Sequence, residues 1–196
     1  MSVASSYEHN WGCRAYLSDW YERGGAYPED EQDQPIYIGR FNLGAITLNL
    51  CLIYQEAKVT GQDFYVLLDY YLEMIRRLHI RTYEYVANLK ASTNPLGFTQ
   101  GGFYGGNLDY DDKIGLDILR PMTTSFGFTS LNELTLLHEG RSLRETNEFA
   151  KEVMTHINKR VQEFKDEDGW LYAVYGTPKM LGLYVATFVE NSVKRS

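Results

Sequence analysis

The clearest hydrophobic pattern in the chain lies between about Asp63 and Lys90. Apolar side chains recur there at intervals of three and four residues, which is the spacing of one helix face. They are Phe64, Leu67, Leu68, Tyr71, Leu72, Ile75, Leu78, Thr82, Tyr85, Val86 and Leu89. The pattern predicts one helix, whose length leaves room for a break near Arg81.

Other stretches predict shorter elements. Residues 43 to 54 are apolar and contain β-branched side chains, which favours a buried strand. Residues 170 to 175 read as another strand after the turn at Asp168-Gly169, and a last helix is expected over 179 to 193. Residues 21 to 35 carry an acidic run among glycines and prolines and predict a solvated loop, and the glycine-rich stretch from 97 to 106 predicts a mobile or tightly turning loop.

Two Ser-x-x-Glu patterns, at Ser130–Glu133 and Ser142–Glu145, have the form of a helix capping box. The first predicts a short helix that ends by Gly140. The second predicts a helix to about Lys165 with its inner face formed by apolar side chains: Phe149, Ala150, Val153, Met154, Ile157, Val161 and Phe164.

Strands that alternate with helices indicate an α/β fold with a partly parallel sheet. The strands are few for 196 residues, so a closed barrel is excluded and part of a larger barrel fits better. We expect a single fragment of one domain. Its parts would be residues 1–60 with a cysteine loop and a strand, 61–92 with the long helix, and 93–196 with mixed helices and a strand.

Composition narrows the function classes. Hydrophobic residues make up 44% of the chain, which suffices for a sizeable core, and a net charge of −7 disfavours binding to a phosphate backbone. No apolar run is long enough to span a bilayer, and residues 1–6 lack the pattern of a signal peptide. We therefore expect a cytoplasmic protein whose two cysteines, Cys13 and Cys51, are free thiols.

Familiar ligand motifs are missing. The sequence has no phosphate-binding Gly-x-x-x-x-Gly-Lys loop, no Cys-x-x-Cys and no His-Glu-x-x-His, and its four histidines are scattered, so we expect no metal site.

Asn42 and Asn49 flank an apolar stretch; each could cap or turn the backbone, or bind a substrate. Thr124, Ser125 and Gly127 precede the first capped helix, where hydroxyl groups and free amides could cradle a phosphate.

Three segments in one order carry a resemblance to a known family. They are Trp11-Gly12-Cys13-Arg14, the stretch from Gly39 to Leu50, and the stretch from Thr123 to Glu133. Together they resemble the catalytic part of the anaerobic (class III) ribonucleotide reductases, and Tyr175-Gly176-Thr177-Pro178 matches a further motif of that family. The departures are Trp11, Cys51, Ser130 and Lys179, where the family has other residues.

The resemblance implies both a fold and a chemistry. The fold would be part of the large α/β barrel of glycyl-radical enzymes and ribonucleotide reductases. The reaction would reduce ribonucleoside triphosphates to deoxyribonucleotides, with Cys13 as the thiyl radical that takes the 3′ hydrogen of the ribose. Asn42 would then be catalytic, and Arg40, Asn49, Thr124, Ser125 and Gly127 would contact the substrate, while Cys51 would be a packed structural thiol.

The resemblance also implies partners outside these residues. Family members carry a glycyl radical and a structural zinc on segments that do not match this sequence, and a separate iron–sulfur, S-adenosylmethionine-dependent protein activates them. We therefore expect this chain to be inactive alone, as a split subunit, a remnant or an excised piece. The alternatives are a non-catalytic assembly or regulatory partner that keeps the fold, and a different glycyl-radical enzyme such as a relative of formate lyases. The reductant and the allosteric effectors stay undetermined.

Overall fold

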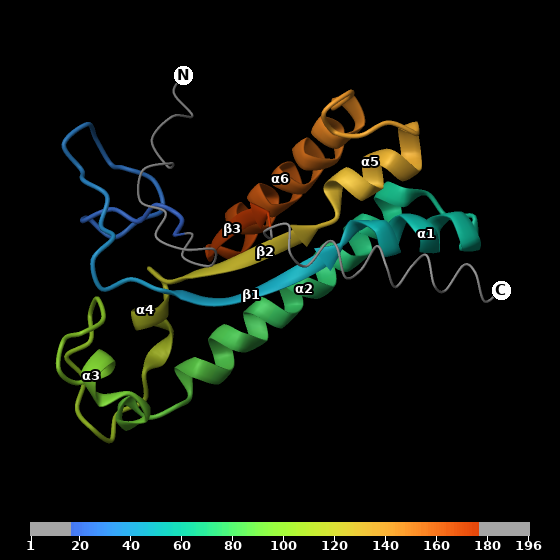
Figure 1. The fold of residues 1–196 in the computed structure, drawn as a ribbon. Coiled ribbons are helices and arrows are strands. Elements are labelled where there is room, and N and C mark those ends of the chain that lie inside the picture. The colour runs from blue at the N-terminus through green and yellow to red at the C-terminus, as the bar shows by residue number, and fades with distance from the viewer. Residues whose placement is uncertain (1–16, 177–196) are drawn as a thin grey trace. The chain divides into compact units, whose positions relative to one another are not determined.

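The computed structural model describes residues 17–176 (Figure 1). Cys13 and the helix expected over 179–193 lie outside the described residues. The strands are β1 (Asn42–Asn49), β2 (Thr123–Thr129) and β3 (Leu171–Gly176). The helices are α1 (Leu50–Thr60), α2 (Phe64–Ala87), α3 (Pro95–Phe98), α4 (Gly115–Leu119), α5 (Leu131–Glu139) and α6 (Glu148–Asp168), with a 3-10 turn at Ala91–Thr93.

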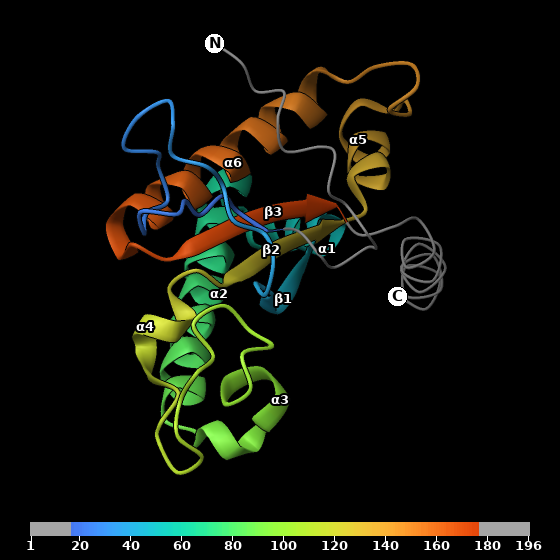
Figure 2. The same ribbon diagram turned by 90° about the vertical axis from the view of Figure 1, so that its left-hand side faces the viewer.

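The three strands form one parallel sheet in the order β1-β2-β3. Helices connect each strand to the next, and the β1 and β2 arrows point the same way in Figure 1, while Figure 2 shows β3 along the other side of β2. Parallel strands need such crossover connections. The α/β class predicted from the sequence is therefore confirmed, and the larger barrel stays a prediction.

The chain divides into two compact units, which we describe separately. Of the described residues, unit 1 contains 17–45, 76–125 and 164–173, and unit 2 contains 46–75, 126–163 and 174–176. Each strand gives its first half to unit 1 and its second half to unit 2.

In unit 2, apolar faces of α1, α5, α6 and the first half of α2 form the core. Its aromatic centre is Tyr54, whose ring lies 5.7 Å from that of Phe64 and 6.4 Å from that of Phe149. His138 stacks on Phe149 at 3.7 Å and hydrogen-bonds the Tyr54 hydroxyl at 3.0 Å. Five of the predicted inner positions of α6 in this unit are buried: Phe149, Ala150, Val153, Ile157 and Val161.

In unit 1, the second half of α2 buries polar aromatic side chains. Tyr83 is fully buried, stacks on Trp170 at 4.2 Å, and donates its hydroxyl proton toward the Met122 carbonyl at 2.9 Å. The predicted long helix is confirmed, without a break at Arg81. Its predicted inner face is wrong beyond Ile75, because His79 and Tyr83 are buried while Leu78 and Tyr85 are 44% and 67% exposed.

The strand predicted over 43–54 is correct only as far as Asn49. There the side chain of Asn49 accepts a hydrogen bond from the Leu52 amide at 3.2 Å and caps α1, which begins at Leu50. An asparagine at this position satisfies one of the free amide donors of the first turn. The apolar residues after it line the inner face of α1, and Cys51 is buried among them as predicted.

The predicted capping box at Ser130 does not form. Ser130 precedes α5 with φ of +66°, a left-handed conformation that disfavours residues with a Cβ, and its side chain makes no capping bond. Glycine, which has no Cβ, would suit that backbone. Ser130 keeps the glycine conformation and buries its hydroxyl.

The second capping box forms its side-chain bonds but starts no helix. The Glu145 carboxylate accepts the Ser142 amide and hydroxyl, both at 2.9 Å, within a turn. Helix α6 begins at Glu148, six residues after Ser142.

Two loops of unit 1 are ordered by buried contacts. Between residues 21 and 35, Asp33 is buried and accepts the backbone amides of Arg23 at 3.3 Å and Glu29 at 3.1 Å, so this member of the acidic run organises the loop rather than facing solvent. The glycine-rich loop turns tightly: a Cβ on Gly106 would lie 2.1 Å from the Gly97 carbonyl oxygen.

Candidate functional site

Two motif residues far apart in the sequence meet in unit 1. The amide nitrogen of Asn42, at the start of β1, donates to the hydroxyl oxygen of Ser125 on β2 at 2.5 Å. The carbonyl oxygen of the Asn42 side chain accepts the backbone amide of Gly44 at 3.1 Å, which fixes which end of the amide faces Ser125. The site is therefore an oriented amide–hydroxyl pair, with Ser125 only 1% exposed.

A buried histidine holds the Ser125 backbone from the neighbouring helix. Nε2 of His79 lies 3.1 Å from the Ser125 carbonyl oxygen, and because a carbonyl only accepts, Nε2 carries the proton. The His79 ring also stacks on Tyr172 at 6.1 Å. Sequence reasoning missed His79, although it lies four residues from both Ile75 and Tyr83 on the buried side of α2.

Burial lowers the pKa of His79 to about 4, with the bond to Ser125 opposing that shift. Between pH 6.5 and 4 the unfolded chain binds a proton that the folded chain rejects, so His79 stabilises the fold above pH 6.5 and this contribution is lost as the pH falls. We expect roughly 3 kcal/mol of unfolding free energy to disappear between pH 7 and pH 4 from this residue.

Urea unfolding at a series of pH values measures this loss. The matched variant is His79→Gln, which keeps an N–H donor for the Ser125 carbonyl but does not titrate. Acidic groups elsewhere affect both proteins alike, so the difference between the two curves isolates His79. Parallel curves for the two proteins would contradict the expectation.

Arg40 is buried, and its guanidinium group binds backbone carbonyls. Its guanidinium donates to the carbonyl oxygens of Pro121 at 2.6 Å, Ile36 at 2.7 Å and Ser18 at 2.5 Å. Burial lowers the pKa of Arg40 to about 10, which leaves it charged at neutral pH. Arg40 therefore ties three loop segments of unit 1 together beside the Asn42 pair, and direct contact with a substrate stays a prediction.

The other predicted residues have varied surroundings. Asn49 caps α1, as described above. Thr124 and Ser125 lie inside β2 and are buried, so these hydroxyl groups do not sit at the N-terminus of α5 as the sequence suggested. In unit 2, a Cβ on Gly127 would lie 2.6 Å from the Thr47 hydroxyl oxygen and 2.8 Å from the Tyr175 ring. Gly127 thus makes room for the hydroxyl pair of Thr47 and Tyr175, whose oxygens are 3.1 Å apart.

The cysteines differ in what the structure shows. Cys13 lies outside the described residues. Cys51 is buried, its sulfur lies 3.5 Å from the Ser130 carbonyl oxygen, and burial raises its pKa to about 12. A thiol that stays protonated is a poor nucleophile, which agrees with a structural role. Within residues 17–176, no group of three or more His, Cys, Asp and Glu side chains could hold a metal ion.

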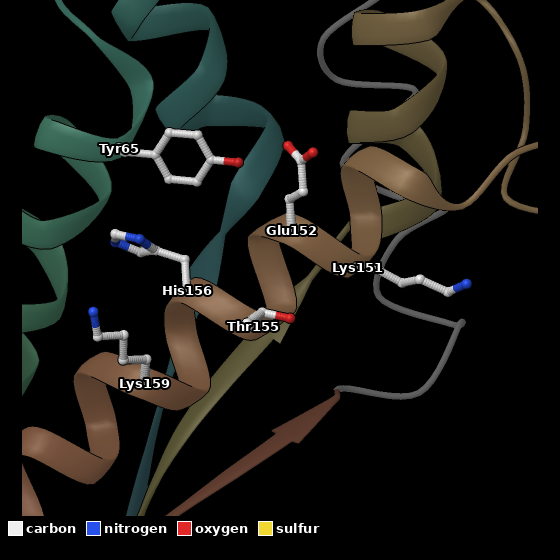
Figure 3. Close-up of a pocket in the computed structure, with 6 residues that line it drawn as sticks. All are labelled: Tyr65, Lys151, Glu152, Thr155, His156 and Lys159. Carbon is white, nitrogen blue, oxygen red and sulfur yellow. The ribbon is translucent and has the colours of Figure 1, made fainter.

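A surface groove in unit 2 holds none of the predicted residues. Tyr65 of α2 and one face of α6 line it, as Figure 3 shows, and the α6 residues are Lys151, Glu152, Thr155, His156 and Lys159. The His156 ring lies 4.9 Å from that of Tyr65, and its Nε2 is 2.7 Å from an Asp69 carboxylate oxygen. Because none of the predicted site residues lines this groove, we assign it no substrate.

Comparison with known proteins decides the family. Residues 2–179 match the family model for anaerobic ribonucleoside-triphosphate reductase, which covers most of the chain. The chain belongs to this family. The anaerobic ribonucleoside-triphosphate reductases of Salmonella typhimurium and Escherichia coli are 28% and 27% identical to it over 184 residues, which is 91% of this chain. That of Enterobacteria phage T4 is 27% identical over 173 residues, 85% of the chain.

This reductase-family chain spans about a quarter of the length of those relatives, between 24% and 26%. The resemblance recognised from the three motifs is confirmed at the level of the family. Among the described helices of this family member, none is long and apolar enough to cross a membrane.

Proposed function

We propose that this chain supplies a substrate-contacting part of an anaerobic ribonucleotide reductase, which converts ribonucleoside triphosphates to deoxyribonucleotides. The observation that carries the proposal is the bond between Asn42 and Ser125. Two residues 83 positions apart, each singled out by a reductase motif, form one oriented hydrogen-bonded pair. A buried hydroxyl that accepts one hydrogen bond still has a proton to donate, which suits contact with a substrate oxygen.

Each residue then has a distinct role. Cys13 would take a hydrogen atom from the 3′ carbon of the ribose, so that an S–H bond forms as the C–H bond breaks. Asn42 and Ser125 would bind ribose oxygens. Arg40 and His79 would act as positioning residues, because Arg40 ties the adjoining loops and His79 holds the Ser125 backbone. Asn49, Thr124 and Gly127 would shape the substrate-binding strands.

The radical that Cys13 needs would come from a glycyl radical on a segment outside these residues, generated by a separate activating protein. The family's structural zinc would likewise lie on another segment. In the part of the chain described here we find no cluster of metal-binding side chains to hold it.

The test is anoxic assembly of the chain with the remaining reductase segments from the same genome and the activating protein. Deoxyribonucleotide formation from ribonucleoside triphosphates is the readout. We expect turnover by the assembly, none by the chain alone, and none after Cys13→Ser. An assembly that forms but whose turnover survives Cys13→Ser would overturn the proposal. An assembly with no turnover at all would point to a non-catalytic partner that keeps the fold.

A further inference from the structure

Helix α2 carries a second row of apolar side chains, and this row is exposed to solvent. The solvent-facing side of a helix ordinarily carries polar side chains. Val66, Tyr70, Met74 and Leu78 follow one another at four-residue intervals and are 64%, 59%, 42% and 44% exposed. We call these four residues the α2 ridge. Side chains four residues apart on a helix lie next to one another, so the ridge is continuous along more than three turns.

The chemistry of the ridge is that of a protein contact. The exposed Arg81 follows it on the same helix, and Tyr85 is 67% exposed one turn further on. Tyrosine, methionine and arginine are the side chains enriched in protein interfaces, while isolated exposed apolar residues are ordinary on any surface. Four large apolar side chains in a single row need a partner to cover them.

We propose that an amphipathic helix from the reductase segments outside these 196 residues packs along the α2 ridge. This inference rests on the proposed function, because it takes the chain as one part of a larger reductase. A row of residues four apart is the surface that a second helix packs against, ridge into groove. Arg81 would meet an acidic side chain at one end of that helix.

Two observations select this occupant over a second copy of the chain. Four partly exposed side chains offer a few hundred Å² at most, against the ~800 Å² per partner that a stable independent complex buries. The ridge is therefore too small to hold a dimer alone and fits a helix that other contacts already hold in place. The matched relatives are also about four times longer than this chain, which leaves ample sequence to supply such a helix.

The open sheet edge agrees with a missing neighbour. Among the described strands, β1 pairs only with β2 and therefore forms one edge of the sheet. Natural proteins cover or charge such an edge, since its free amides and carbonyls invite pairing. Within residues 17–176 no further strand pairs with this edge, so an adjoining segment of the reductase is expected there as well as on the ridge.

The experiment co-expresses the tagged chain with the remaining reductase segments from the same genome under anoxic conditions and measures co-elution in size-exclusion chromatography. The ridge variants are Tyr70→Glu and Met74→Glu. The matched control is Val59→Glu, which places the same charge at an 87% exposed apolar position of α1. All three sites are solvent-exposed, so circular dichroism and urea midpoints of the isolated variants should equal those of the wild type.

We expect the wild-type chain and Val59→Glu to co-elute with the other segments, and each ridge variant to bind at least tenfold more weakly. Equal binding by the ridge variants would overturn the inference, as would failure of the wild-type chain to co-elute. A dimer of the isolated chain that Met74→Glu converts to a monomer would overturn it in favour of a second copy. If the complex forms only with an intact ridge but makes no deoxyribonucleotide, the inference about the ridge is supported and the proposed function is contradicted.

Discussion

Replacing Arg40 with methionine should lower the free energy of unfolding of the isolated chain by at least about 3 kcal/mol. Methionine keeps much of the side-chain volume but donates no hydrogen bond, so the carbonyls of Ser18, Ile36 and Pro121 lose their partner. A buried acceptor left unsatisfied costs ~1–3 kcal/mol, and three are affected together. A loss of this size is a large fraction of the stability of an ordinary domain.

Urea unfolding without nucleotide measures this effect directly. Arg40→Lys should lie between the wild type and Arg40→Met, because an ammonium group donates but cannot span three carbonyls in fixed directions. The control is Arg120→Met, since Arg120 has a 57% exposed side chain that pairs with the 97% exposed Asp117, and its replacement should change stability by less than about 0.5 kcal/mol. If Arg40→Met left the free energy of unfolding unchanged but weakened nucleotide binding, Arg40 would instead act in substrate binding.

The role of Arg40 could not be predicted from the sequence because its three partners are backbone carbonyls. No residue type marks a carbonyl acceptor, and these come from residues 18, 36 and 121. The motif identified Arg40 as important, but only the fold shows which atoms it binds. Asp33 is a similar case: as one acid in an acidic run it predicts solvent exposure, whereas its carboxylate is buried on backbone amides.

The spacing of apolar residues predicted the long helix correctly, but it predicted only part of the buried face of that helix. The pattern treated Leu78 and Tyr85 as inner residues because they are apolar, yet His79 and Tyr83 take those places. Both can be buried because each finds a carbonyl: His79 that of Ser125, and Tyr83 that of Met122. Hydrophobicity alone cannot show that a polar ring will be satisfied, and the leftover apolar row is the α2 ridge.

Local capping patterns were the weakest guide, for a physical reason. A capping box needs an extended backbone at its first residue, and Ser130 is held at φ of +66°. Ser142 does meet its glutamate, but α6 starts six residues later. The pairing of Asn42 with Ser125 was likewise out of reach of spacing rules, and the family motifs predicted only that both residues matter.

The Asn42–Ser125 pair gives the second large expectation, which concerns activity. In the assembled reductase, Ser125→Ala or Asn42→Ala should each lower kcat/KM by about 10²-fold, because removing one oriented hydrogen-bond donor from an active site typically costs ~10²–10³. Each variant leaves the other member of the pair without its partner, so the two residues act as a unit. The double variant should therefore lose little more than either single one.

Steady-state kinetics of the four proteins, with urea unfolding of each, separates catalysis from folding. Ser125→Ala should reduce stability by only about 1 kcal/mol, the usual worth of one hydrogen bond. Ser142→Ala is the matched control: its hydroxyl binds Glu145 in an exposed turn of unit 2, and we expect full activity. Multiplicative losses in the double variant would mean that Asn42 and Ser125 contact the substrate independently. If kcat/KM fell only in proportion to the free energy of unfolding, the pair would have a structural role, as a bond that joins β1 to β2. A coupled loss of kcat/KM in variants that stay folded is the result that identifies a substrate-binding pair.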